Sequence, residues 1–135
     1  KRMRPLENPL INRRIKTLGT FSVPITVTNI ATGASVTVDA LVDTGATLTI
    51  LPASKLHDIG LTPKGRQAFE PGDGRLVELR LATAEVTVEG QTAGTSVAFG
   101  PEGVRATLGV VVLESTGLTV EPKHYRLVPA NLLLM

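Results

Sequence analysis

The sequence predicts an all-β domain, mostly antiparallel, with one or two short helices. Apolar and polar residues alternate with a period of two from Phe21 onward, which is typical of strands with one buried face. The 13 glycines and 9 prolines recur between the apolar runs, so the strands are short and joined by turns. Hydrophobic residues make up 42% of the chain but aromatic ones only 3%, so the core of this single domain must consist mainly of Val, Leu, Ile and Ala.

Residues 1–17 show no clear periodicity and are predicted to form a basic arm that precedes a domain over 18–135. Six of the 14 basic residues lie within the first 16 positions, opposed by Glu7 alone, whereas residues 17–135 carry a net charge of −3. Such an arm can contact nucleic acid or an anionic membrane. A solvated tail or linker is the favoured interpretation, so no nucleic-acid partner is expected.

The first half of the domain is predicted to contain three strands and one helix. The alternating pattern places strands over 21–27, 36–43 and 48–51, with a turn at 29–34 that contains Gly33. A short helix is expected over 52–59, because proline suits a first helical turn and Gly60 suits the position just past the end. Leu56 and Ile59, three residues apart, would face the core.

The second half begins with a hairpin. Pro71-Gly72-Asp73-Gly74 is a strong turn signal between strands over 66–70 and 75–88, and a further strand follows over 92–99. Gly109 then leads into a short helix over 110–116, which Gly117 ends. Three apolar pieces follow, over 118–120, 125–128 and 132–135, separated by Pro122 and Pro129.

The strand that ends at Val42 runs into Asp43-Thr44-Gly45-Ala46, and this pattern occurs once. Such a segment is either an ordinary turn, since Asp, Thr and Gly are all turn residues, or half of a catalytic device that needs a second carboxylate. Asp39 cannot supply it within one chain, because four residues of strand span about 13 Å. Asp39 is therefore expected to face solvent.

The composition excludes several classes of site. The chain has no cysteine, which excludes disulfides, thiolate chemistry and Cys-ligated metals. His57 and His124 are too few for a histidine-based metal site without the help of carboxylates and are expected at the surface, so neither a metal nor a cofactor is expected. No apolar run approaches the roughly 20 residues of a membrane span. No signal peptide is visible, and a cytoplasmic location is weakly favoured.

The segment Leu41 to Ala46, followed by Thr49-Ile50-Leu51-Pro52, resembles the active-site segment of retroviral-type aspartic proteases, in particular their prokaryotic single-domain members. Further segments resemble the same family in the same order over about residues 20–130: Gly72-Asp73-Gly74-Arg75 at the flap, Phe99 to Gly103, Thr107-Leu108-Gly109 with Thr107 where a Leu or Ile is usual, and Tyr125 to Pro129 at the closing strand.

The resemblance implies a closed acid-protease β-barrel with one half-site per protomer, so that a homodimer assembles one active site around a two-fold axis. It implies an aspartic endopeptidase in which Asp43 of each copy is catalytic and the substrate is a peptide or protein. Thr44, Gly45 and Ala46 would form the active-site turn. Gly72, Asp73 and Gly74 would form a flap that covers substrate, although an ordinary hairpin loop is the alternative. Gly109 would be structural.

Two departures from the family and two alternative functions remain. Asp73 places a charge at a flap tip that is usually apolar. Residues 131–135 are apolar apart from Asn131, which fits a terminal strand at a dimer interface or the start of a further element. The alternatives to a protease are a non-catalytic dimerisation or peptide-binding module of the same fold, and a plain β-barrel interaction domain with a basic arm.

Overall fold

The computed structural model describes residues 20–69, 74 and 76–133, so the predicted basic arm lies outside the described residues. The larger sheet consists of β2 (Ser22–Thr28), β3 (Ser35–Val42), β4 (Thr49–Pro52), β5 (Gly65–Phe69), β6 (Val77–Val88), β7 (Gln91–Gly100) and β8 (Thr107–Leu108). A smaller sheet consists of β9 (Leu118–Glu121) and β10 (Arg126–Pro129). The helices are α2 (Ala53–Asp58), α3 (Val110–Thr116) and α4 (Ala130–Leu133).

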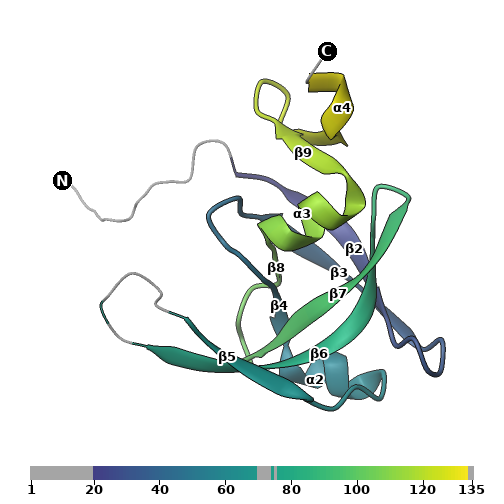
Figure 1. Ribbon diagram of the computed structural model, residues 1–135, viewed down its shortest axis with the longest axis vertical. Helices are drawn as coiled ribbons and strands as arrows, with labels where there is room; N and C mark the ends of the chain where they lie inside the picture. Colours follow the sequence, from purple (N-terminus) through teal and green to yellow (C-terminus); the bar gives the residue numbers. More distant parts are fainter. Residues whose placement is uncertain (1–19, 70–73, 75, 134–135) are drawn as a thin grey trace.

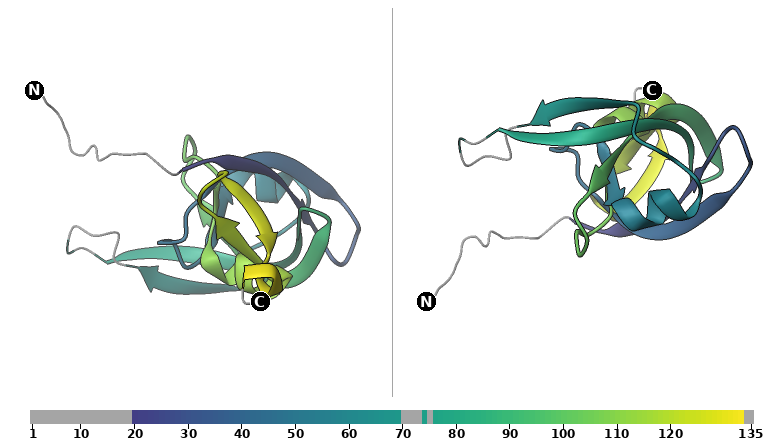
Figure 2. Two further views of the ribbon diagram at one scale, coloured as in Figure 1. Left: turned by 90° about the horizontal axis from the view of Figure 1, so that it is seen from above. Right: turned by 90° about the horizontal axis from the view of Figure 1, so that it is seen from below.

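The strands of the larger sheet form a ring (Figures 1 and 2). Their order is β2-β3-β8-β4-β7-β6-β5, and β2 also pairs with β6, which closes the ring and leaves β5 outside it. Most pairings are antiparallel, but β3 with β8 and β4 with β7 are parallel. The predicted all-β, mostly antiparallel fold with short helices is therefore confirmed.

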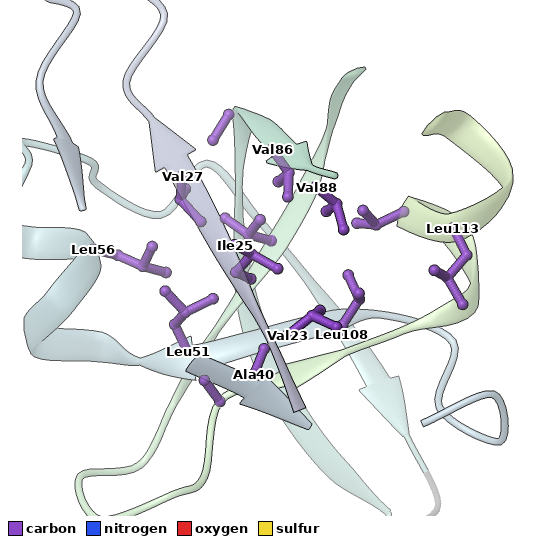
Figure 3. Close-up of a cluster of buried hydrophobic side chains, with 14 of the residues drawn as sticks. Val23, Ile25, Val27, Ala40, Leu51, Leu56, Val86, Val88, Leu108 and Leu113 are labelled. Carbon is purple, nitrogen blue, oxygen red and sulfur yellow. The ribbon is translucent and has the colours of Figure 1, made fainter. Parts of the chain in front are cut away.

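The interior of the ring is aliphatic, as the composition predicts. Alternate residues of β2 are buried, with Val23 7% exposed, Ile25 1% and Val27 0%. The even-numbered residues 82–88 of β6 are buried in the same way. Figure 3 shows side chains from β2, β3, β4, β6, β8 and the two longer helices meeting in one cluster. Burial of one face of each strand fixes the pairing register, since a register shift of one residue would turn every buried side chain of that strand to the solvent.

Helix α2 begins one residue later than predicted, directly after Pro52. It ends at Asp58, one residue before the predicted end, and Gly60 stands just past the end as expected, with φ +84°, a left-handed conformation that glycine adopts without strain. Leu56 and Ile59 are both buried against the core. At its start, the backbone N–H and the hydroxyl of Ser54 donate to the Glu102 carboxylate at 3.0 and 2.7 Å, which ties the helix to the loop after β7.

The last part of the chain contains a helix that was not predicted. This third short helix, α4, occupies residues 130–133, in the segment for which a terminal strand and the start of a further element were the two alternatives. Pro129 ends β10 because it has no N–H for a strand ladder, and the Ala and Leu residues that follow favour helix. The N–H of Ala130 donates to the Gly117 carbonyl at 2.8 Å. Leu134 and Met135 lie outside the described residues. No helix in the described part of the chain is long and apolar enough to cross a membrane.

Gly109 lies where two backbone segments approach closely. A Cβ atom at this position would stand 2.4 Å from the Leu48 carbonyl oxygen and 2.8 Å from that of Thr47. The Gly109 N–H donates to the buried Thr49 hydroxyl at 3.0 Å. A side chain at Gly109 therefore has no space, and the segment after β8 would have to move away from the loop before β4.

We expect Gly109→Ala to lower the free energy of unfolding by about 1–3 kcal/mol, because the added methyl group overpacks a backbone contact that cannot relax freely. Gly94→Ala on β7 is the matched control, since its Cβ would meet nothing within 4 Å. Urea denaturation of both variants measures the difference. Equal stability of the two variants would contradict the close approach.

The stability contributed by Glu102 should depend on pH. The Ser54 hydroxyl, and then the Ser54 N–H, lower the pKa of the Glu102 carboxyl from its ordinary value of 4.5 in the folded protein. A lowered folded-state pKa stabilises the fold above pH 4.5, and this contribution is lost as the pH falls below that value. We expect Glu102→Gln to lower the urea midpoint at pH 7 and to lose this effect toward pH 3. Ser54→Ala removes the hydroxyl that lowers the pKa of Glu102 and should therefore reduce the pH dependence of the urea midpoint. If the difference in urea midpoint between wild type and Glu102→Gln were the same at pH 7 and pH 3, the stabilising role of the Glu102 carboxylate would be contradicted.

Candidate active site

The segment Asp43 to Ala46 forms a tight turn at the end of β3. The Asp43 N–H donates to the Leu108 carbonyl at 3.0 Å, and the Asp43 carbonyl accepts from the Ala46 N–H at 3.0 Å. Within the turn, the Gly45 N–H donates to Asp43 Oδ1 at 2.9 Å. The turn therefore orients its own carboxylate, which is exposed at the surface of the single chain.

Gly45 and its neighbours have different surroundings. A Cβ on Gly45 would stand 3.3 Å from Asp43 Oδ1, tighter than an ordinary contact, so glycine keeps the N–H close to the carboxylate. Thr44 is exposed, and its hydroxyl makes no hydrogen bond with any residue that the structure describes. Ala46 is half-buried. The turn thus presents a carboxylate and a hydroxyl to solvent while its last residue packs inward.

The back of this loop is held by a segment more than 60 residues later in the chain. The N–H groups of Val110 and Val111, at the start of α3, donate to the carbonyls of Ala46 and Thr47 at 2.8 and 3.1 Å. Thr49, which is 0% exposed, accepts the Gly109 N–H through its hydroxyl. The loop over 43–48 is therefore fixed between β3, β8 and α3, and its conformation does not depend on its own residues alone.

The contribution of Thr49 and of the start of α3 was not predicted from the sequence. One signal was present, because Thr49 is a hydroxyl residue in a strand that is otherwise apolar. A buried hydroxyl has to find a hydrogen-bond partner, so this position predicts a contact with some backbone group. The identity of that group as Gly109 follows only from the fold.

The hairpin of β5 and β6 extends from the ring on the same side as the loop over 43–48 (Figures 1 and 2). Of the predicted flap residues, Gly72 and Asp73 lie outside the described residues, and Gly74 is exposed with φ +84°. On β6 and just before it, Leu76 and Val77 are 77% and 37% exposed. The structure thus brings an exposed hairpin and the Asp43 turn to one side of the ring.

The remaining candidates lie at the surface, as expected. Asp39 is exposed on β3, opposite Pro24 of β2. His57 is exposed, with its ring centroid 5.2 Å from that of Phe99. His124 is exposed, and its Nδ1 lies 2.7 Å from Oε1 of Glu121. The described residues contain no group of three or more His, Cys, Asp or Glu side chains that could hold a metal ion.

Comparison with known proteins agrees with this geometry. A family model described as "Aspartyl protease" matches residues 23–112, which include the Asp43 turn, the β5–β6 hairpin, β8 and the first residues of α3. No curated protein matches the chain significantly. The family match covers more than half of the 135 residues, and the chain therefore belongs to the retropepsin-like aspartyl protease family.

Proposed function

We propose that this protein is an aspartic endopeptidase that acts as a homodimer, with one Asp43 from each copy forming the catalytic pair. Membership of the aspartyl protease family supports a protease-like function in general. The observation that carries the proposal is the exposed Asp43 carboxylate, which is oriented by the Gly45 N–H and fixed from behind by β8 and α3. A carboxylate held this firmly at the surface is pre-organised for chemistry.

The second carboxylate has to come from a second chain. In the described part of one chain, no hydrogen bond joins the Asp43 carboxylate to another acidic side chain. One carboxylate cannot activate water and protonate the substrate carbonyl at the same time. Two exposed copies of the turn, related by a two-fold axis, would bring the two carboxylates together.

In this pair, the two carboxyl groups share one proton, because like charges in close contact do not both ionise easily. The ionised Asp43 accepts a proton from water as the water oxygen attacks the carbonyl carbon of the scissile peptide. The protonated carboxyl of the partner's Asp43 donates its proton to the carbonyl oxygen. Asp43, now protonated, then transfers its proton to the amide nitrogen, while one hydroxyl of the tetrahedral gem-diol returns a proton to the partner's Asp43. The C–N bond breaks to give a carboxylic acid and an amine, and the pair again shares one proton.

The other residues of the turn and hairpin have supporting roles in this proposal. The Thr44 hydroxyl, which has no partner among the described residues, bonds across the two-fold axis and holds the two turns together. Ala46 keeps space for the substrate backbone beside the carboxylates. Gly72, Asp73 and Gly74 form the flap tip that closes over an extended peptide and excludes water.

Replacement of Asp43 should abolish cleavage. We expect Asp43→Asn to lower kcat/KM for a peptide substrate by about a thousandfold or more, because the pair loses both its base and its shared proton. Cleavage of a peptide library between acid and neutral pH measures the effect. Asp39→Asn is the matched control, since Asp39 is exposed on β3, four residues before Asp43, and should be dispensable. A dimeric wild type that binds peptides but cleaves none would instead indicate a peptide-binding module.

Activity should depend on protein concentration. We expect the specific activity to fall steeply on dilution below the dimer dissociation constant, since each chain carries one half of the catalytic pair. Sedimentation equilibrium at the same concentrations gives the dimer fraction, and the two curves should coincide. A rate per chain that stays constant in a sample shown to be monomeric would exclude the shared site.

A further inference from the structure

A cavity of about 540 Å³ lies at the end of β3 opposite the Asp43 turn. Its walls come from the β2–β3 turn, from the segment after α2 and from the middle of β6. The β2–β3 turn precedes β3 and Asp43 follows it, and the eight residues of β3 span roughly 25 Å. The cavity is therefore separate from the candidate active site, and its volume is in the usual range of ligand pockets.

The cavity opens onto a break in the pairing of β6. On this edge, β6 pairs with β5 as far as Leu81, which lies opposite Gly65. It pairs with β2 from Glu85 onward, which lies opposite Thr28. Residues 82–84 have no partner on this edge among the strands that the structure describes. Thr83 is at the centre of this break and lines the cavity.

The backbone N–H and C=O of Thr83 point into the break. The turn between β6 and β7 has two residues, so Val88 and Gln91 flank it as a hydrogen-bonded pair. Such pairs alternate along an antiparallel ladder, so even-numbered residues of β6 bond to β7 and odd-numbered ones face the other edge. The Leu81 carbonyl agrees with this, since it accepts from the Lys64 N–H at 2.7 Å. Thr83 therefore offers one donor and one acceptor to the cavity.

The remaining walls combine one cation with apolar side chains. Lys64 lines the cavity and forms no ion pair with any residue that the structure describes. No acidic residue is among the described residues that line the cavity. Leu61 and Ala82 are buried and line it from the core, while Ile30 of the β2–β3 turn is 56% exposed. The cavity thus suits a ligand with a negative charge and an apolar group.

The walls of the cavity are fixed before a ligand binds. Asn29 is buried, and its side-chain Nδ2 donates to the Ile59 carbonyl at 2.9 Å. Its Oδ1 accepts from the Ala31 N–H at 2.9 Å. These two hydrogen bonds connect the β2–β3 turn to the end of α2, so the two walls keep their separation. A pre-formed cavity loses less conformational entropy on binding than a flexible one.

We propose that this cavity binds the C-terminal residue of a peptide. The N–H of that residue donates to the Thr83 carbonyl, and its carboxylate accepts from the Thr83 N–H and from the Lys64 ammonium. An apolar side chain packs against Leu61 and Ile30. Pairing with a free strand edge and capture of a terminal carboxylate are both general modes of peptide recognition.

The size and charge of the break favour this ligand over other peptide segments. The break is three residues long and has β2 and β5 on its two sides, so it admits a chain end more readily than a continuous strand. The Lys64 charge favours a terminal carboxylate over a terminal ammonium group. The proposal does not depend on the proposed protease activity, because it involves neither Asp43 nor the β5–β6 hairpin tip.

Labelled peptides that end in leucine, with either a free carboxylate or an amide, test the proposal. The Asp43→Asn variant is used so that no peptide is cleaved. We expect the free-carboxylate peptide to bind about tenfold more tightly in fluorescence anisotropy, as for a charge-assisted hydrogen bond. Added to this variant, Lys64→Gln should reduce the ratio to within about twofold. Lys123→Gln, which removes an equal charge from the exposed β9–β10 turn, should leave the ratio unchanged.

Three results of these titrations would overturn the proposal. They are a ratio near one with Lys64 intact, a ratio that Lys64→Gln does not change, and no binding at millimolar peptide. The apolar contact has its own test: Ile30→Ala should weaken the leucine-ended peptide about threefold and leave a serine-ended peptide unaffected. Equal weakening of both peptides would contradict the contact with Ile30.

Amide NMR spectra of the same protein locate the peptide. The Thr83 amide signal should shift when the free-carboxylate peptide is added, because its N–H gains a charged acceptor. Shifts confined to the Asp43 turn would overturn the proposal, since the peptide would then bind at the candidate active site. Acetate is the probe for a bare anion site, and an equal Thr83 shift with acetate at the same concentration would also overturn the proposal.

Discussion

The structure depends on the contact between the loop over 43–48 and the backbone that follows β8. Strand β8 is only two residues long, yet it lies between β3 and β4 and closes the ring there. Gly109 then passes so close to the Leu48 carbonyl that no side chain fits, and its N–H is satisfied by the buried Thr49 hydroxyl. Because buried backbone groups have to be paired, this one junction holds the Asp43 turn, the ring and the start of α3 in a single arrangement.

A rigid turn next to an exposed hairpin suits the proposed chemistry. The Asp43 carboxylate is oriented by the Gly45 N–H inside the turn, while the loop behind it is held by Val110 and Val111. In the proposed homodimer, little reorganisation would then be needed for catalysis, and such pre-organisation is a main source of catalytic rate.

The sequence predicted the strands well where apolar and polar residues alternate along them. It predicted the ends of the helices and the end of the chain less well, because short-range signals compete there. The strands from β2 to β7 lie within a few residues of the predicted ranges, because burial of one face imposes a period of two. The helix predicted over 52–59 is one residue shorter at each end, since α2 covers Ala53–Asp58. Helix α4 was not predicted, and of the two alternatives for the end of the chain the terminal strand is not found over the described residues 131–133, since Pro129 ends β10 and α4 follows. The role of Thr49 was missed, because its partner lies 60 residues away.

The sequence by itself determined the fold class, the aliphatic core and the single Asp43-Thr44-Gly45 turn, since all three depend on residue type and spacing over a few positions. Only the tertiary structure decided how that turn is held and to which side of the ring the β5–β6 hairpin extends. The reason is physical: β8 inserts between β3 and β4, and β6 pairs with β2, through pairings between strands that lie far apart in the sequence. Their energies come from backbone hydrogen bonds that any sequence can form, so only the packed chain selects them.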